Sequence, residues 1–148
     1  MNLLVINGPN LNLLGLREPE IYGNRTYNDL IDMIKADCAA LGITVSAFQS
    51  NHEGAIIDAI HDAYGKYDGI IINPGAYTHY SIAILDALKA VAIPTIEVHL
   101  SDIHSREEFR NVSITGLAAF KIIYGLGFDG YRLAVKEMKE YLEAQADG

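Results

Sequence analysis

Two patterns of apolar residues alternate along this chain. Short runs that are almost continuously apolar predict buried strands, and longer stretches with apolar residues every three or four positions predict amphipathic helices. The predicted strands are Leu3–Asn7, Ile43–Phe48, Gly69–Asn73, Pro94–Val98 and about Phe120–Tyr124. The predicted helices are about Tyr27–Leu41, Ala55–Tyr64, Ser81–Val91 and Tyr131–Ala144.

The ends of these elements carry recognisable signals. Thr26 and Asp29 have the spacing of a capping box at the start of the first helix, and Gly42 and Gly65 follow helical stretches as natural stops. The last helix is expected to bury five residues, namely Tyr131, Ala134, Val135, Met138 and Leu142. A short acidic helical turn is predicted at Ser105–Phe109.

Strands that alternate with helices imply right-handed crossovers and a parallel sheet covered on both faces. We therefore predict an α/β fold, a flavodoxin-like doubly wound five-stranded parallel sheet in the order 2-1-3-4-5. The chain has 148 residues, without repeats, linkers or low-complexity tracts, so residues 1–148 are expected to form a single domain.

The segment from Asn7 to Gly23, NGPNLNLLGLREPEIYG, is too long for an ordinary strand-to-helix connection, which takes ~2–6 residues. The apolar residues Leu11, Leu13 and Leu14 are expected to anchor it to the core. We interpret it as an ordered functional loop, with a rigid start at 8–14 and a mobile lid at about 15–25.

Polar side chains concentrate where the predicted strands end, which is the edge at which such sheets bind ligands. They are His52, His79, His99, His104, Arg17, Tyr22, Glu97 and Arg106, with Arg110 just beyond. Glu97 and His99 lie two residues apart and so share one face of a strand, which favours a histidine held for acid/base work.

Structural roles compete with these assignments. A lone histidine at a strand end is as often a satisfied structural residue, and Tyr22 could equally tether the first loop. The asparagines at positions 7, 10 and 12 could be turn formers, and the three arginines could be solvated surface charges.

Charge and composition exclude several classes of protein. The net charge of −8 argues against non-specific nucleic-acid binding, although a few placed arginines can still attract an anion. The single Cys38 excludes an internal disulfide, no secretory signal opens the chain, and no apolar run reaches ~18 residues. We therefore expect a soluble cytoplasmic protein without membrane contact.

Several cofactor and catalytic motifs are missing from the sequence. There is no phosphate-binding glycine motif, no nucleophile elbow and no convincing set of metal ligands, although spacing does not exclude a Ser–His nucleophile. The remaining interpretation is acid/base chemistry, without a cofactor or metal, on a small anionic molecule.

Four blocks occur together in order: GPNLNLLGLREPEIYG, QSNHEG, INPGAYTHYSIAILDAL and IEVHLSDIHSREEFR. In combination they resemble the type II 3-dehydroquinate dehydratases of the shikimate and quinate pathways, and the likeness covers nearly the whole chain. It implies a flavodoxin-like fold and the reversible anti elimination of water from 3-dehydroquinate, through an enolate, to give 3-dehydroshikimate.

The resemblance also implies roles for individual residues. Tyr22 matches the base, Arg17 the neighbour that favours its phenolate, and His99 the acid that protonates the departing hydroxyl. Glu97 is implied to orient His99, and Asn10 to position a water at the enolate oxygen. The implied substrate-binding residues are Asn73, His79 and Arg110 for hydroxyls, the backbone amides of Leu100 and Ser101 for the carboxylate, and Asp86 from a neighbouring subunit.

The same resemblance implies a homo-oligomer, a dodecamer built from trimers. Asp102 departs from the family pattern, because Asn is usual after the Leu-Ser pair, and its side chain is expected to point away from the carboxylate pocket. Val112, Phe120 and Lys121 also replace commoner small or polar residues.

Rival functions remain open. The main one is a flavodoxin-like carrier or binding module without a reaction of its own. If such a module bound flavin, the purified protein would be yellow. A receiver domain would need paired carboxylates after the first strand, where Asn7-Gly8-Pro9 stands instead. A hydrolase of esters or amides is a more distant alternative.

Overall fold

The structure, a computed structural model, describes residues 1–16, 20 and 24–147. Its centre is a parallel five-stranded sheet in the order β2-β1-β3-β4-β5. The strands are β1 (Asn2–Asn7), β2 (Thr44–Gln49), β3 (Gly69–Asn73), β4 (Thr95–His99) and β5 (Lys121–Tyr124). The predicted flavodoxin-like fold and strand order are confirmed.

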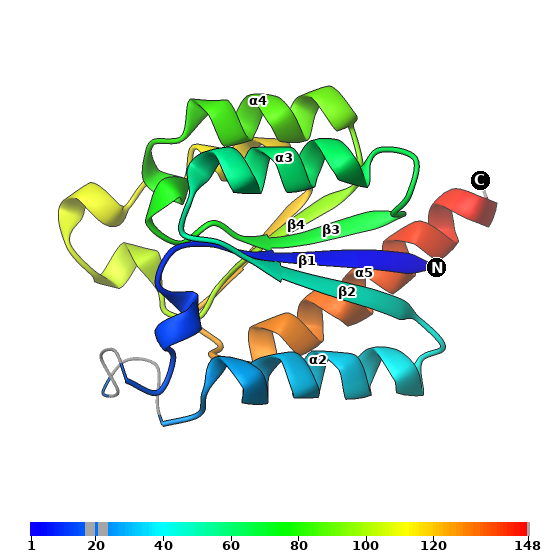
Figure 1. The fold of residues 1–148 in the computed structure, drawn as a ribbon, viewed down its shortest axis with the longest axis horizontal. Coiled ribbons are helices and arrows are strands. Elements are labelled where there is room, and N and C mark those ends of the chain that lie inside the picture. Colours follow the sequence, from blue (N-terminus) through cyan, green and yellow to red (C-terminus); the bar gives the residue numbers. More distant parts are fainter. Residues whose placement is uncertain (17–19, 21–23, 148) are drawn as a thin grey trace.

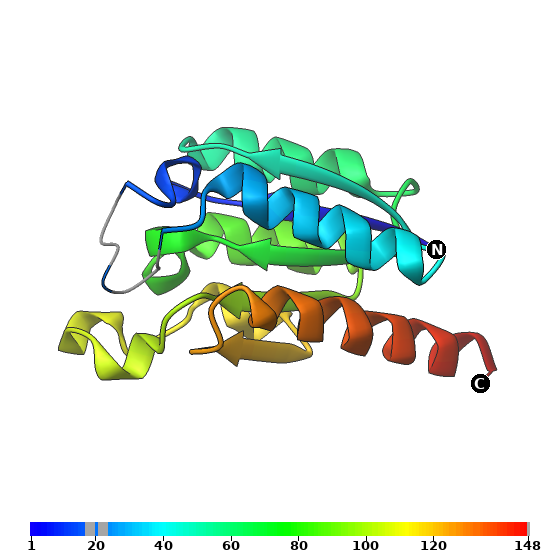
Figure 2. The same ribbon diagram turned by 90° about the horizontal axis from the view of Figure 1, so that it is seen from below.

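Helices cover both faces of the sheet (Figures 1 and 2). Helices α2 (Tyr27–Ala40) and α5 (Asp129–Asp147) lie on one face, and α3 (Glu53–Ala63) and α4 (Ile82–Val91) on the other. Each face has its own buried apolar cluster, one centred on Leu3, Val5 and Tyr131 and the other on Ile6, Ile70 and Ile72. Because side chains alternate along a strand, successive residues of β1 and β3 supply both clusters.

Five short 3₁₀ helices occur among the described residues, and they connect the longer elements. They are η1 (Leu11–Leu13), η2 (Gly75–His79), η3 (Ile103–Ser105), η4 (Glu108–Arg110) and η5 (Thr115–Ala118). They gather at the carboxyl ends of the strands or along the chain between β4 and β5. The carboxyl end of the sheet lies at the left of Figure 1.

Local signals explain where two helices begin. The Thr26 hydroxyl accepts the Asp29 N–H at 3.2 Å and the Asp29 carboxylate accepts the Thr26 N–H at 2.9 Å, so the predicted capping box is confirmed. Ser81 is the N-cap of α4 and not its first residue, because its hydroxyl accepts the Ile84 N–H. Helix α3 begins at Glu53, two residues before the predicted start, and this places an acid in its positive first turn.

Other boundaries correct the sequence-based prediction. Strand β4 is Thr95–His99 and not Pro94–Val98, because His99 pairs with Tyr124 of β5; His99 is therefore a strand residue. The helical turn predicted at Ser105–Phe109 is replaced by η3 and η4. Helix α5 starts at Asp129, and Leu142, expected to be buried, is only partly buried.

Among the described residues, no helix combines the length and apolar character needed to cross a bilayer. Helix α5, the longest of them, spans 19 residues but has acidic and basic residues along its length.

Candidate active site

The first loop begins with a rigid turn that is locked to the loop after β3. The Gly8 N–H donates to the Asn73 carbonyl at 2.8 Å, and a Cβ at position 8 would lie 2.4 Å from the Pro74 carbonyl oxygen. Gly75, with φ of 61°, packs against Pro9. Only glycine fits the contact at position 8, so the chain from Gly8 is fixed against the end of β3.

Asn10 follows in a left-handed conformation with φ of 69°. Its N–H donates to Asn51 Oδ1 at 3.0 Å, and Gln49 Nε2 donates to the Gly8 carbonyl at 3.1 Å, so the loop after β2 supports the loop after β1. Leu11 and Leu14 are buried, as the anchor prediction requires. The prediction is wrong for Leu13, which is 41% exposed.

A cavity of about 170 Å³ opens beside this loop, at the carboxyl edge of the sheet. Its lining brings together most of the residues predicted for the site, from the loops after β1, β3 and β4. The residues that line it are Pro9, Asn10, Leu11, Asn73, Gly75, Ala76, His79, His99, Leu100, Ser101, Ile103, Arg106 and Arg110.

His99 is held from behind by a carboxylate. Its Nε2 lies 2.8 Å from Glu97 Oε2, and Glu97 is fully buried. Burial raises the pKa of Glu97. The hydrogen bond and charge of His99, and the hydroxyls of Ser113 and Thr115, lower that pKa by more than burial raises it, so the net shift is downward. An ionised Glu97 only accepts hydrogen bonds, so His99 Nε2 carries a proton and Nδ1 is left for proton transfer.

Three hydroxyls complete the surroundings of Glu97. Thr78 and Ser113 donate to Oε2 at 3.0 and 2.5 Å, and Thr115 donates to Oε1. We call Glu97, His99 and these hydroxyl residues the carboxylate network.

A second network lies behind Asn73 and carries no charge. Asn73 Nδ2 donates to the Tyr131 hydroxyl at 3.1 Å, and that hydroxyl donates to Asn7 Oδ1 at 2.7 Å. Asn7 Nδ2 in turn donates to the Tyr27 hydroxyl at 3.2 Å, and Asn73 Oδ1 accepts the Gly75 N–H at 3.1 Å. These contacts fix which way the Asn73 amide faces; we call Asn7, Asn73, Tyr131 and Tyr27 the amide network.

His79 is fixed by the backbone of a distant segment. Its Nδ1 lies 2.8 Å from the Val112 carbonyl oxygen, and because a carbonyl only accepts, Nδ1 carries the proton. Desolvation lowers the pKa of His79, the bond to Val112 raises it, and the charge of Arg110 lowers it; the net direction is down. A neutral His79 therefore presents Nε2 as an acceptor.

The cations of the cavity are Arg106 and Arg110. Arg110 Nε lies 2.7 Å from Glu107 Oε2 but is not aligned for a hydrogen bond, and its side chain is 22% exposed. No aspartate or glutamate is among the described residues that line the cavity. The described part of the cavity wall therefore presents cations and no carboxylate, on a chain with a net charge of −8, and it suits a small anion.

Several predicted residues lie elsewhere. Tyr22 and Arg17 fall outside the described residues. Asp86 is exposed on α4 and does not line the cavity. His52 precedes α3 as its N-cap, and His104 packs edge-on against Tyr124 with ring centroids 5.1 Å apart.

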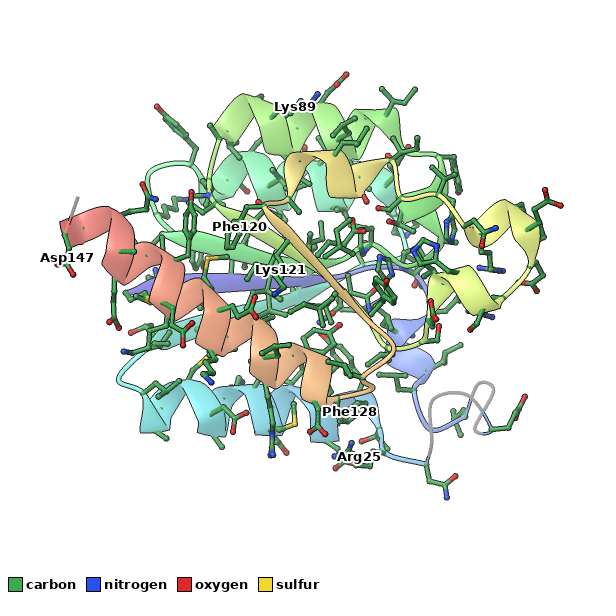
Figure 3. All side chains as sticks on the ribbon, turned by 180° about the vertical axis from the view of Figure 1, so that it is seen from behind. Arg25, Lys89, Phe120, Lys121, Phe128 and Asp147 are labelled. Carbon is green, nitrogen blue, oxygen red and sulfur yellow. The ribbon has the colours of Figure 1, made fainter. Side chains whose placement is uncertain are left out.

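The two ends of the segment that carries Tyr22 are close together. A Cβ at Gly15, whose φ is 90°, would lie 3.0 Å from the Asn24 carbonyl oxygen. Arg25 lies over the Phe128 ring, 4.0 Å from its centroid, just before α5 (Figure 3). Gly15 and Asn24, which flank the residues outside the description, therefore lie side by side.

Asp102 is engaged locally. Its Oδ1 accepts the His104 N–H at 2.9 Å at the start of η3, and it is not among the residues that line the cavity. Its carboxylate thus serves the turn after β4, as expected of a side chain that points away from the pocket.

Sequence reasoning missed the residues that stand one layer behind the cavity. Ser113 and Thr115 belong to no motif, Thr78 was given no role although it lies in one of the four quoted blocks, and Tyr131 was recognised only as a buried helix residue. These hydroxyls are recognised only by their positions around Glu97 in the folded protein, and a single sequence does not contain that information.

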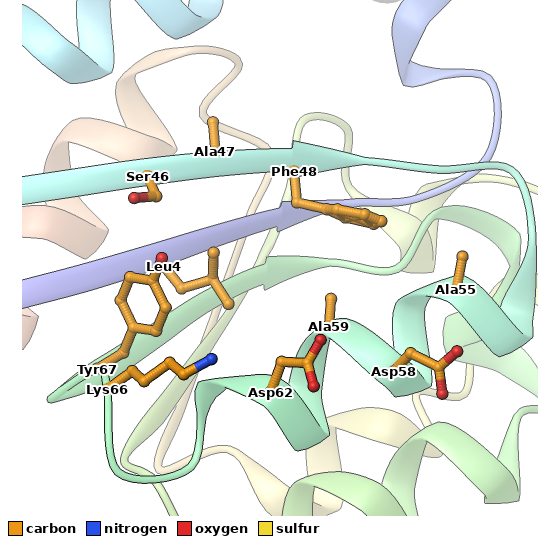
Figure 4. Close-up of a pocket in the computed structure, with 10 residues that line it drawn as sticks. All are labelled: Leu4, Ser46, Ala47, Phe48, Ala55, Asp58, Ala59, Asp62, Lys66 and Tyr67. Carbon is orange, nitrogen blue, oxygen red and sulfur yellow. The ribbon is translucent and has the colours of Figure 1, made fainter.

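A larger cavity of about 460 Å³ lies between β2 and α3 (Figure 4). Its charged residues are Asp58, Asp62 and Lys66, and it contains neither histidine nor arginine. Within the described residues, no group of three or more histidine, cysteine or acidic side chains is arranged to hold a metal ion. The acid/base groups and the cations therefore meet only in the smaller cavity at the carboxyl edge, as far as the described residues extend.

The fold and this cavity define a doubly wound α/β protein with a cationic acid/base site at the carboxyl edge of its sheet. The family model described as Dehydroquinase class II matches residues 1–139. The chain belongs to the class II dehydroquinase family.

Individual relatives agree with this assignment. A 3-dehydroquinate dehydratase of Clostridium perfringens strain SM101 is 59% identical over 146 residues, which cover 98% of this chain and 100% of that protein. A catabolic 3-dehydroquinase of Aspergillus clavatus is 56% identical over a match that covers 93% of this chain and 91% of that protein. The crystal structure of a type II dehydroquinase from Butyrivibrio crossotus superposes with a TM-score of 0.93 at 54% identity, covering 94% of this chain and 97% of that one.

Proposed function

We propose that this protein catalyses the reversible elimination of water from 3-dehydroquinate, which gives 3-dehydroshikimate through an enolate. The observation that carries the proposal is the imidazole of His99, bonded at 2.8 Å to a buried carboxylate, in one cavity with Arg110, His79 and Asn73. The substrate is inferred from membership of the family, because relatives that match nearly the whole chain are named 3-dehydroquinate dehydratase.

His99 is the proposed general acid. Its Nε2–H is committed to Glu97, so a proton for the departing hydroxyl comes from Nδ1 of the imidazolium form. The buried bond to Glu97 holds the ring in one orientation. General acid catalysis of this kind contributes roughly 10²–10⁴-fold to a rate.

Binding is assigned to the rest of the cavity. Asn73, His79 and Arg110 take the substrate hydroxyls, and the backbone amides of Leu100 and Ser101, at the end of β4, take the carboxylate. The support for this is that all five residues line the cavity with His99. Asn10, on the rigid turn of the first loop, is proposed to position a water at the enolate oxygen.

Tyr22 is the proposed base, and Arg17 the group that favours its phenolate; both lie outside the described residues. An unperturbed tyrosine has a pKa of ~10, so ionisation at neutral pH needs a shift of about three units, or roughly 4 kcal/mol. Tyr22→Phe removes one hydroxyl and is expected to abolish turnover while substrate still binds. Isothermal titration with 3-dehydroquinate, beside a kinetic assay, separates the two effects; an active Tyr22→Phe enzyme would remove this assignment.

The direct test is to add 3-dehydroquinate to the purified protein and follow the ultraviolet absorption of the product enone. A rise that His99→Ala abolishes supports the dehydratase. No turnover by a folded wild-type protein, or the visible bands of a bound flavin, would instead favour the carrier or binding module.

We also propose that the enzyme is a homo-oligomer, a dodecamer built from trimers, in which Asp86 of one subunit reaches the site of the next. Asp86 is exposed on α4, and apolar side chains are exposed around it, with Tyr80 and Ile82 each 62% exposed. Leu117, 70% exposed, lies on η5, which packs against α4. Light scattering during size-exclusion chromatography measures the mass; a monomer at assay concentration would exclude the shared site.

A further inference from the structure

The buried carboxylate of Glu97 is surrounded by hydroxyls from segments far apart in the sequence. Thr78 comes from η2, Ser113 from the chain before η5, and Thr115 from η5 itself. Thr78 and Thr115 are fully buried, as Glu97 is, so bulk water does not complete their hydrogen bonds. An ionised carboxylate in such a place is costly unless protein groups donate to it.

Four donor groups of the protein lie within hydrogen-bond distance of the Glu97 carboxylate. A carboxylate accepts only and offers about four lone-pair positions on its oxygens. Oε2 receives His99 Nε2–H at 2.8 Å and the hydroxyls of Ser113 and Thr78, and Oε1 receives the hydroxyl of Thr115. The ionised form can accept at all four contacts, whereas a protonated carboxyl group would itself have to donate at one of them.

Backbone contacts hold these hydroxyls in place. The Ile114 N–H donates to the Thr78 carbonyl at 2.7 Å, and the Gly116 N–H donates to Ser113 Oγ at 2.9 Å. A Cβ at Gly116 would lie 2.7 Å from Ser113 Oγ and 3.2 Å from Glu97 Oε2. The turn around Gly116 is therefore pressed directly onto the carboxylate, which a larger residue would prevent.

We propose that Thr78, Ser113 and Thr115 are positioning residues which keep Glu97 ionised and in a single orientation, so that they set how far into acid Glu97 keeps the charge that orients the His99 ring. The inference rests on the proposed role of His99 as the acid. Among the described residues, the charged or titratable groups near His99 and Glu97 include His79 on η2 and Arg110 on η4, and Arg106 lines the same cavity. Neither donates a hydrogen bond to Glu97 among the contacts described above.

Thr115→Val tests the proposal, because valine has nearly the same shape and lacks the hydroxyl that serves Oε1. Removing a donor disfavours the ionised form, so Glu97 takes up a proton at higher pH. We expect the titration midpoint of Glu97, followed by 13C NMR of the labelled carboxyl carbon, to move up by about one to two pH units, as a hydrogen bond to a charged group implies. Thr115→Ser keeps the hydroxyl and is expected to restore the wild-type midpoint.

Thr95→Val is the matched control. Thr95 is also buried on β4, two residues before Glu97, but its hydroxyl donates to the Ile93 carbonyl at 2.9 Å. Its removal should leave the titration midpoint of Glu97 in place, whereas a purely structural role would move that midpoint equally in Thr95→Val and Thr115→Val.

The outcomes separate this inference from the proposed function. If the wild-type enzyme is active and the Glu97 midpoint is unshifted in Thr115→Val, the inference alone is overturned; a folded wild type inactive on 3-dehydroquinate overturns the proposed function. If Thr115→Val does not fold, as judged by circular dichroism, Ser113→Ala takes its place with the same expected direction, and an unshifted Glu97 midpoint there overturns the inference.

Discussion

The carboxylate network and the amide network stand behind the same cavity and differ in charge. In the amide network, the Tyr131 hydroxyl links Asn7 and Asn73 on adjacent strands, and every contact is between neutral groups. In the carboxylate network, three hydroxyls and one imidazole converge on Glu97. The amide network can only fix the orientation of side chains, whereas the carboxylate network also determines which nitrogen of His99 carries a proton.

This difference assigns the two networks to different parts of the reaction. A neutral hydrogen bond contributes roughly 0.5–1.5 kcal/mol, and one to a charged group about twice that. Loss of a contact in the amide network should therefore weaken substrate binding through Asn73. Loss of a contact in the carboxylate network should reduce turnover through His99.

Glu97→Gln should have the largest effect. The glutamine amide brings donors into a place where Thr115, Ser113 and His99 all donate, so the imidazolium loses its partner. We expect kcat to fall by about 100-fold or more, with a small change in KM, because general acid catalysis is worth roughly 10²–10⁴-fold. Steady-state kinetics measure this, and a variant that loses only affinity would contradict the division between the networks.

Tyr131→Phe should have the next largest effect. It leaves Asn73 Nδ2 and Asn7 Oδ1 without the hydroxyl that joins them, at a cost of about 1–3 kcal/mol for buried polar groups. We expect a lower free energy of unfolding in urea and a KM raised by about tenfold, with kcat changed less. If Tyr131 acts on binding through Asn73, Tyr131→Phe should have no further effect on KM in an Asn73→Ala background. Additive effects of the two substitutions on KM would refute this coupling.

The two networks should also fail at opposite ends of the pH scale. The pKa of Glu97 is lowered in the folded protein, so its stabilisation is present above the unfolded value of ~4.3 and is lost as pH falls. Burial raises the pKa of Tyr131, the bond from Asn73 opposes this, and the net shift is upward. Its stabilisation is present below the unfolded value of ~10 and is lost as pH rises.

Thermal unfolding between about pH 3 and pH 11 measures this contrast. The Tm difference between wild type and Glu97→Gln should narrow in acid, and the difference between wild type and Tyr131→Phe should narrow in alkali. Curves that stay parallel over the whole range would show that neither group titrates differently in the folded and unfolded states.

Tyr27→Phe should have the smallest effect and serves as a control for Tyr131→Phe. Tyr27 lies at the partly buried end of the amide network, where its hydroxyl accepts from Asn7 Nδ2 at 3.2 Å. Water can replace that contact, so we expect a loss of less than ~1 kcal/mol in urea unfolding and an unchanged KM. A rise in KM equal to that of Tyr131→Phe would show that the whole network, and not the link to Asn73, governs binding.

Much of the fold could be predicted because its signals are local. The apolar run Gly69–Asn73 matches β3 at both ends, and the capping box at Thr26 matches the start of α2. The shared face of Glu97 and His99 follows from the two-residue period of a strand. Helix α3 was predicted two residues short because a polar start, His52-Glu53-Gly54, looks the same in a loop and in a first helical turn.

The rest of the site depends on pairings between distant segments. The end of β4 at His99 requires β5 alongside it, and the split of the chain between β4 and β5 into η3, η4 and η5 has no periodic signal. The hydroxyl of Thr115 reaches Glu97 only because η5 packs against η2 and β4. Tyr22 and Arg17 remain predictions from the first loop.

Segments that follow β4 in the sequence complete both networks. Ser113 and Thr115 come after β4, and Tyr131 comes at the start of α5, 124 positions beyond the Asn7 that it contacts. A ribosome-bound chain that has exposed only its first four strands therefore has buried amides and a carboxylate without these partners. During translation, the site should form only when α5 emerges and docks, so a C-terminal truncation before residue 131 should remove activity as well as a helix.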